Sequence, residues 1–261
     1  MKYAMGSIIK KDFRSVTDNR HLFTGLLVVP LVLTIVLPSI FMAAVHFSQG
    51  DPDMERLLSL LPASSRMGNT ELALGGVLLN NLLPVFFLMI PIMAASIMAA
   101  SSFVGEKEKH TLETLLYSPL SVGQIFRAKV MASFLLSMMV SLISFCAMLT
   151  VIELEAVFLM GAPLLPGTNW PVVLLLVSPA VSMIAVTLIV RGSAKARSME
   201  ESQQSAVFLI IPLLLLIVGQ FTGIMLLNAW FLLGIGAACA FLAWLLLRKC
   251  LRRFTYEMLL K

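Results

Sequence analysis

The stretch Phe103-Val-Gly-Glu-Lys-Glu-Lys-His-Thr-Leu-Glu-Thr-Leu-Leu-Tyr-Ser-Pro-Leu-Ser121 separates two long apolar runs of the chain. A charged segment in this position predicts a loop that joins two membrane spans. Leu112, Leu115 and Leu116 recur at the spacing of one helical face. Pro119 ends that short helix, because the residue before a proline is pushed out of the α region. The segment therefore predicts a small amphipathic helix at the membrane surface, which either docks another protein or merely connects two spans.

The composition of the whole chain is that of a membrane protein. Hydrophobic residues make up 59% of the 261 residues and charged residues only 13%, about half of the charged fraction of a soluble protein. The mean hydropathy is +0.95. The net charge of +5 does not indicate a nucleic-acid partner, because the basic residues lie in short loops beside apolar runs. The composition therefore predicts that the protein is embedded in a lipid membrane.

Long uncharged runs predict an all-α polytopic membrane protein with six transmembrane helices in a single domain, residues 1–261. The run Leu22–Phe47 has 26 residues without a charge, more than the roughly 20 that cross the hydrocarbon. The run 206–247 is too long for one span and suits two, with a turn near Asn228. The predicted spans are 22–47, 82–104, 130–152, 171–190, 206–227 and 229–247.

The distribution of basic residues predicts which loops lie inside the cell. Of the 19 Lys and Arg residues, all but Arg56 and Arg66 fall in the N-terminal segment, in two alternate loops and in the C-terminal tail. Such an excess marks the cytoplasmic side of a membrane, so both termini are predicted to be cytoplasmic. The basic residues 1–21 are expected to form an interfacial amphipathic helix on that side. Residues 72–81 are expected to pack outside the second span or at the interface.

The run from Gly105 to Ser121 resembles the cytoplasmic loop of ABC-2 type transporter permeases, with His110 where that family most often has glycine. The basic segment 10–20 with the apolar run that follows it is similar to the family's N-terminus and first span. The segment 191–204 resembles the family's second inner loop. The resemblance covers nearly the whole chain, and the sodium-exporter-like branch is the nearest.

The resemblance implies a permease subunit of an ATP-driven exporter that works by alternating access in the cytoplasmic (inner) membrane of a prokaryote. Two such subunits, identical or different, would assemble with ABC ATPase subunits. The chain lacks the phosphate-binding pattern G-x-x-x-x-G-K-[ST], so ATP and Mg would bind the partner subunit, and this chain would be no enzyme and bind no cofactor. The loop helix between spans 2 and 3 would be the ATPase-coupling helix, carried by Gly105, Glu106, Glu108, Thr111, Leu112, Glu113, Leu115, Leu116, Ser118 and Pro119. Glu106, Glu108 and Glu113 would supply its polar contacts.

Two other functional classes are an intramembrane enzyme and a membrane immunity or sensor protein. An intramembrane enzyme would need ionisable groups at membrane depth, and the six predicted spans contain no Asp, Glu, Lys or Arg. The sequence is also compatible with a membrane immunity or sensor protein that binds a membrane-active peptide without transport. Copurification with an ATPase would rule that class out.

Few polar side chains lie within the predicted spans. Ser133, Ser137, Ser141 and Ser144 share one helix face, where they either line a translocation cavity or allow close helix packing, as small residues do in membranes. Gln220 would be costly to leave unpaired in lipid, so it is expected to face protein or the cavity. These residues are the candidates for a transport path.

The third predicted span has signals at both ends. Ser121-Val-Gly-Gln124 is a capping-box pattern that would start its helix, and Glu153 and Glu155 close it on the outer side. These two carboxylates are either an outer gate through which cations leave or ordinary residues of the membrane boundary.

Overall fold

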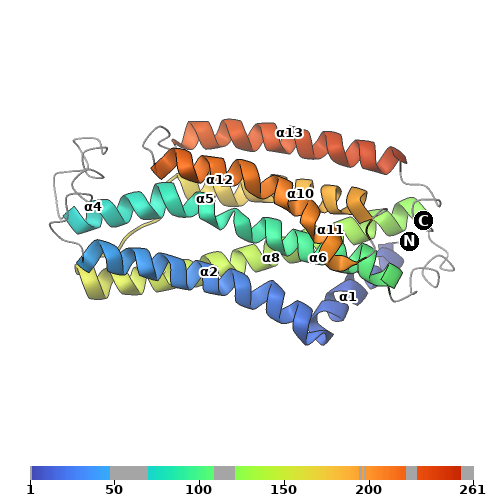
Figure 1. Ribbon diagram of the computed structural model, residues 1–261, viewed down its shortest axis with the longest axis horizontal. Coiled ribbons are helices and arrows are strands. Elements are labelled where there is room, and N and C mark those ends of the chain that lie inside the picture. The colour runs from blue at the N-terminus through green and yellow to red at the C-terminus, as the bar shows by residue number, and fades with distance from the viewer. Residues whose placement is uncertain are drawn as a thin grey trace.

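The computed structural model of the protein describes residues 2–47, 70–108, 121–193, 196, 198–221 and 228–253. Every secondary-structure element in these ranges is a helix. The long helices run side by side along one axis and form a bundle (Figure 1). The prediction of an all-α fold is therefore confirmed.

Successive helical segments run back and forth along the bundle (Figure 1). In chain order they are α1 (Lys2–Asp18), α2 (Arg20–Phe47), α4 (Thr70–Val77), η2 (Leu78–Leu82), α5 (Leu83–Phe87), α6 (Met89–Glu108), α8 (Val122–Glu155), η3 (Ala156–Met160), α9 (Asn169–Val172), η4 (Val173–Val177), α10 (Ser178–Ser193), α11 (Met199–Gln203), η5 (Gln204–Ala206), α12 (Val207–Phe221) and α13 (Ala229–Arg253). The end of the bundle that carries α1 is called the α1 end below, and the opposite end is called the far end.

Within the described ranges, five segments are long and apolar enough to cross a membrane. They are Leu22–Phe47, Glu71–Glu108, Val122–Met160, Asn169–Ser193 and Ala229–Leu251. The remaining predicted span, 206–227, contains the 15-residue helix α12, which is about 22 Å long against a hydrocarbon thickness of about 30 Å. Residues 222–227 lie outside the described ranges, so the sixth span stays a prediction.

The second span differs most from the prediction. The span was predicted to begin near residue 82, with 72–81 outside it or at the interface, and the helix runs from Thr70 to Glu108 with a single turn at Leu88. The 38 residues of Glu71–Glu108 would extend about 57 Å. The helix therefore continues beyond the predicted start of the span at residue 82. Because its length exceeds the hydrocarbon thickness of about 30 Å, the placement of 72–81 outside the span or at the interface stays a prediction.

Two π-helical turns explain how this chain carries Pro84 and Pro179 inside long helices. Pro84 follows η2 and Pro179 follows η4, each two residues after the end of the π-helical turn. A proline has no N–H, and its ring collides with the carbonyl four residues earlier. Widening the preceding turn relieves that collision and lets the helix continue. The backbone N–H just before each proline reaches five residues back, from Leu83 to the carbonyl of Leu78 and from Ser178 to that of Val173.

The third span also begins and ends beyond its predicted limits. α8 starts at Val122, and the backbone N–H of Ser121 donates to Oε1 of Gln124 at 3.1 Å, so the predicted capping box is confirmed. After η3 the chain leaves the helix at Gly161, whose φ of 73° lies in the left-handed region that favours glycine.

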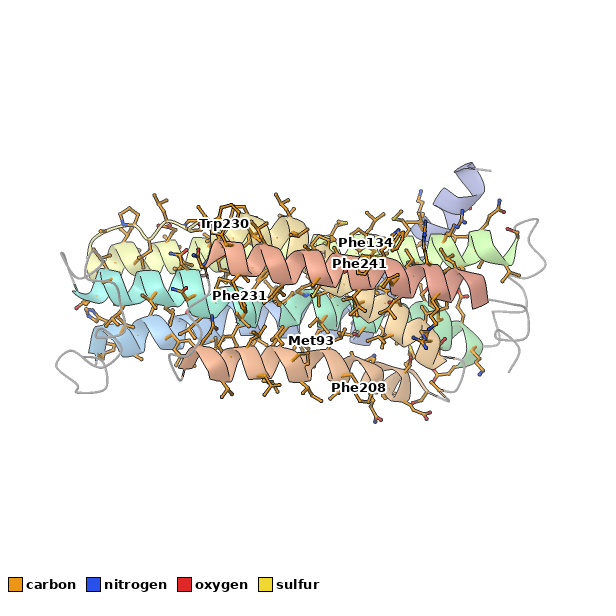
Figure 2. The ribbon with its side chains drawn as sticks, turned by 90° about the horizontal axis from the view of Figure 1, so that it is seen from above. Met93, Phe134, Phe208, Trp230, Phe231 and Phe241 are labelled. Carbon is orange, nitrogen blue, oxygen red and sulfur yellow. The ribbon has the colours of Figure 1, made fainter. Side chains whose placement is uncertain are left out.

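α6 forms the centre of the bundle, between α8 and α10. Its small side chains Ala94, Ala95, Ala99 and Ala100 are fully buried, and small residues let neighbouring membrane helices approach closely. The outer surface is apolar. Figure 2 labels Phe208 and Trp230 on α12 and α13, and these side chains are 74% and 79% exposed. A bundle with large apolar side chains on its outside suits a lipid environment.

The packing of α13 against η4 depends on Gly236. A Cβ atom there would lie 2.7 Å from Cδ2 and 2.8 Å from Cγ of Leu176. We expect Gly236→Leu to lower the free energy of unfolding by about 1–3 kcal/mol, as overpacking does, measured by thermal melting in detergent. Gly234→Leu on the same helix is the control, because a Cβ there meets no atom within 4 Å. Equal losses in the two variants would contradict this account of the contact.

Candidate functional site

The predicted coupling residues begin where α6 ends. Gly105, Glu106 and Glu108 lie in the last turns of α6 at the α1 end. The other predicted members lie in 109–120, outside the described residues: Thr111, Leu112, Glu113, Leu115, Leu116, Ser118 and Pro119. The structure therefore describes the root of the predicted coupling helix and how that root is held.

Glu106 is held inside the bundle by two lysines. Its side chain accepts from Nζ of Lys129 at 2.5 Å and from Nζ of Lys11 at 2.6 Å. Glu106 is 8% exposed and Lys129 only 2%. Nζ of Lys129 also donates to the backbone carbonyl of Ser102 and lies 5.2 Å from the ring centroid of Phe103. These contacts tie the end of α6 to the first turns of α8.

A second carboxylate, Asp12, joins the same group from α1. Its Oδ2 accepts from Oγ of Ser102 at 2.7 Å. Burial raises the pKa of Asp12, an effect that the nearby charge of Lys129 and the hydrogen bond from Ser102 oppose. Asp12 occupies the buried stripe of α1 between Ile8 and Val16, each one helical turn away. A position that would normally be apolar thus carries an acid.

Lys11, Asp12, Glu106 and Lys129, with Ser102, are called the ionic cluster below. It has two cationic and two anionic side chains, so its charges balance. It joins α1, α6 and α8 at one end of the bundle. Removing one charge from such a group leaves another buried without its partner, which is strongly destabilising.

The second predicted inner loop meets the same root. Oε1 of Glu108 accepts from the backbone N–H of Met199 at 3.1 Å. A Cβ atom on Gly105 would lie 3.0 Å from the sulfur of Met199, so α11 packs closely on the end of α6. Ser198 caps α11 by accepting from the backbone N–H of Glu201 at 3.2 Å. The N-terminal helix and the second loop therefore both contact the root of the first loop.

The serine face of α8 is buried. Ser133, Ser137, Ser141 and Ser144 are each 0–2% exposed. The hydroxyl of Ser137 donates to the carbonyl of Phe134, and that of Ser141 donates to the carbonyl of Ser137, both at 2.8 Å. Within the described residues, the hydroxyls of Ser133 and Ser144 have no hydrogen-bond partner. The face serves helix packing along most of its length, while Ser141 also lines a cavity that is described below.

Polar contacts at the far end gather on the carbonyls around η2. Trp170 Nε1 donates to the carbonyl of Leu79 at 3.0 Å, and Asn169 Nδ2 donates to that of Asn80 at 2.7 Å. Gln220 Nε2 donates to the carbonyl of Asn81 at 2.7 Å. Gln220 therefore faces protein, as expected. The π-helical turn and Pro84 disturb the regular helical bonding of these carbonyls, and side chains from α9 and α12 bind them.

Glu153 and Glu155 lie in the last turn of α8, far from the ionic cluster. Both are partly buried, and Oε2 of Glu155 has no hydrogen-bond partner among the described residues. The gate and the boundary interpretations of these carboxylates both remain predictions.

Sequence reasoning missed Lys129 and Asp12. Lys129 had been counted only among the basic residues of the inner loop. A signal was present, because Lys129 precedes Ser133, Ser137 and Ser141 at the same four-residue spacing. The buried face of α8, extended by one turn, reaches Lys129.

The family profile of the ABC-2 type transporters matches residues 3–231 of the chain. No curated protein matches the chain. The match spans every described helix from α1 to α12 and the first residues of α13. The family match and the apolar helices together identify the protein as an integral multi-pass membrane protein. The chain belongs to the ABC-2 type transporter family, as a membrane-spanning permease subunit of an ABC transporter.

Proposed function

We propose that this chain is the membrane half of an exporter that a separate ABC ATPase drives. Two permease subunits, identical or different, would pair with ATPase subunits in the inner membrane of a prokaryote. The α1 end would face the cytoplasm, with both termini on that side. The spans would rock between inward-open and outward-open states as the ATPase pair closes and opens.

The observation that carries this proposal is the contact among three segments at the α1 end. Each segment was expected on the cytoplasmic side from its basic residues alone. Lys11 of α1 binds Glu106 at the root of the first loop, and Met199 of α11 binds Glu108 there. A partner that docks on this end would therefore touch segments that are already joined to one another.

The ionic cluster suggests how a push on the loop 109–120 would reach the spans. The loop continues directly from α6, whose last turns are bound to α8 through Lys129 and to α1 through Lys11. A displacement of the loop would move these helices together rather than bend the end of α6 alone. The carboxylate of Glu106 is bound by Lys129 and Lys11 inside the chain, which favours other carboxylates as the contacts with the partner. Glu108 and Glu113 remain the candidates for polar contacts with the partner.

The coupling helix is tested by the double variant Leu112→Ser/Leu115→Ser. Amphipathic helices bind grooves through apolar anchors, and full burial of one leucine is worth roughly 1.5–3 kcal/mol. We expect ATPase association to weaken by about tenfold or more, since each 1.4 kcal/mol is about tenfold. The measurements are copurification of the ATPase subunit and substrate-stimulated ATP hydrolysis in the reconstituted complex.

Leu57→Ser/Leu60→Ser is the matched control. It makes the same change at the same spacing in the loop that is predicted to face outward, so ATPase association should be normal. Normal association and stimulation in Leu112→Ser/Leu115→Ser would mean that the loop is only a connector. If no ATPase copurifies with the unmodified chain, the exporter proposal itself fails.

A further inference from the structure

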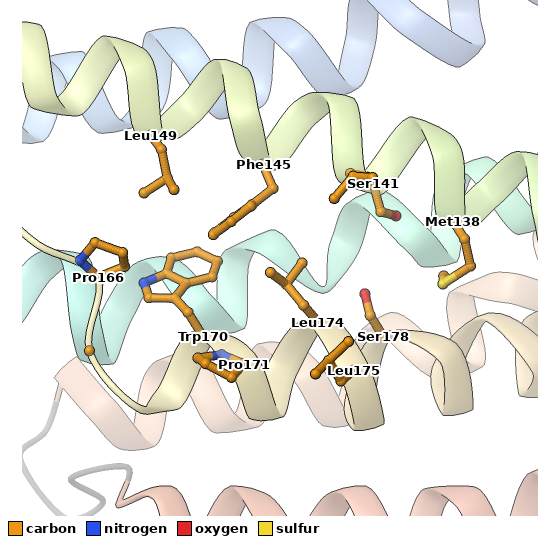
Figure 3. A pocket seen from close by; sticks show the side chains of 12 residues that line it. Met138, Ser141, Phe145, Leu149, Pro166, Trp170, Pro171, Leu174, Leu175 and Ser178 are labelled. Carbon is orange, nitrogen blue, oxygen red and sulfur yellow. The ribbon is translucent and has the colours of Figure 1, made fainter.

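A cavity of about 480 Å³ lies between α8 and the segment 166–178 (Figure 3). Its walls are mostly apolar and aromatic, and none of the described residues that line it is charged. Phe145 and Leu149 come from α8, and Trp170 and Leu174 come from the opposite wall. Cavities of this size and character commonly hold drug-sized ligands, with a few polar groups that fix the orientation.

The polar group in this cavity is the hydroxyl of Ser178. Ser178 is 1% exposed, and its Oγ has no hydrogen-bond partner among the described residues. Figure 3 shows Ser178 and Ser141 extending from opposite walls into the same space. The hydroxyl of Ser141 donates to the carbonyl of Ser137, so only its lone pairs remain for a ligand. The hydroxyl of Ser178 is available both to donate and to accept.

The cavity opens on the side of the bundle rather than at either end. Leu142 and Leu175 line it and are 58% and 80% exposed. Leu142 lies near the middle of the predicted third span, and Leu175 lies within the predicted fourth span. A ligand would therefore enter from the lipid, which favours a molecule that is already dissolved in the membrane.

We propose that this cavity binds an uncharged amphiphile, with its apolar body against Phe145 and Trp170 and one polar group on Ser178. A charged ligand is disfavoured, because the lining offers no opposite charge and an unpaired ion in a low-dielectric site is costly. Such a molecule has two sources, a resident membrane lipid or a transported compound. The proposal that the cavity binds an amphiphile does not depend on the proposed export function. Only the distinction between a resident lipid and a transported compound rests on that function.

The probe is a long-chain primary alcohol with a diazirine at mid-chain, crosslinked by light to the full chain in nanodiscs. Mass spectrometry of the adduct should place the label on α8 or on the segment 166–178. In Ser178→Ala the half-saturating concentration of the probe should rise about two- to tenfold, the usual worth of one hydrogen bond. The variant should fold normally, because it removes a hydroxyl that has no partner within the described residues.

Ser182→Ala is the matched control. Ser182 lies on the same helix and is 0% exposed, and its hydroxyl also lacks a partner among the described residues, but it does not line the cavity. Its labelling should equal that of the unmodified chain. Labelling outside the cavity, or equal half-saturation in Ser178→Ala and Ser182→Ala, would overturn the proposal.

A second variant tests the lateral opening. Leu142→Trp places a larger side chain at the mouth and should reduce labelling at least as strongly as Ser178→Ala. Leu215→Trp, at a 68% exposed position on α12, should label normally, and undiminished labelling in Leu142→Trp would contradict lateral entry. If the alcohol also stimulates the partner's ATP hydrolysis, the cavity holds a transported compound. Labelling without stimulation identifies a resident lipid, and labelling without any ATPase partner would count against the export function alone.

Discussion

Replacing Lys129 with methionine should destabilise the folded chain by about 3–5 kcal/mol, as removal of one partner from a buried ion pair does. The substitution keeps an unbranched side chain but removes the only fully buried cation of the ionic cluster. Glu106 and Asp12 would then face each other with only the half-exposed Lys11 to balance them. Thermal melting and the yield of folded protein in detergent measure the loss.

The control is Lys249→Met on the exposed face of α13, where we expect less than about 0.5 kcal/mol. The double variant Lys129→Met/Glu106→Gln should recover part of the lost stability, because one cation and one anion remain, Lys11 and Asp12. A double-mutant cycle over these variants isolates the coupling between the two side chains. Equal stability of Lys129→Met and Lys249→Met would show that the ionic cluster does not hold the α1 end together.

Trp170→Ala should cost about 3–5 kcal/mol, the usual range for deletion of a large buried aromatic side chain. Trp170 is 1% exposed, and its ring centroid lies 5.5 Å from that of Phe87 and 5.0 Å from that of Phe145. Its Nε1 donates to the carbonyl of Leu79 in η2. The variant therefore loses both a close-packed ring and a hydrogen bond that joins α9 to the second span. Thermal melting in detergent is again the measurement.

Trp170→Phe separates these two contributions, because it keeps most of the ring and loses the donor. An unpaired buried carbonyl costs about 1–3 kcal/mol, so this variant should fall between the unmodified chain and Trp170→Ala. Trp230→Ala makes the same deletion at a position that is 79% exposed and should change stability little. If Trp230→Ala lowers the stability as much as Trp170→Ala does, the burial of Trp170 does not explain the loss of stability.

The existence and order of five of the six spans could be predicted from the sequence, because uncharged runs and basic loops are properties of consecutive residues. Their bounds could not. A proline such as Pro84 normally interrupts regular backbone hydrogen bonding. Whether the chain breaks or forms a π-helical turn depends on neighbours that bind the affected carbonyls, here Trp170, Asn169 and Gln220. Those neighbours are distant in sequence and come together only in the fold.

The candidate site could also be predicted in part from consecutive residues, while its long-range contacts could not. The motif from Gly105 to Ser121 located one end of the bundle, and the structure adds how its root is held. Glu106 was expected to face a partner, because a carboxylate in a polar loop is usually solvated. Its burial follows from Lys129 and Lys11, which approach it from two other helices. The four-residue spacing on α8 could place Lys129 on the buried face, but it does not identify its partner. Glu106 is 23 positions from Lys129 and 95 positions from Lys11.

The π-helical turns before Pro84 and Pro179 also change which residues share a face of the helix. The assignment of faces before each wide turn differs from the assignment after it. A π-helical turn holds one residue more than an α-helical turn, and one residue corresponds to about 100° of rotation. Positions three or four apart therefore share a face within α4 or within α6, but that rule does not carry across η2 from one to the other. A helical wheel drawn through Leu78–Leu82 as a regular α-helix would misplace the positions of α6 by about 100°. Any alignment of this span with a relative that lacks the wide turn should place a one-residue gap there.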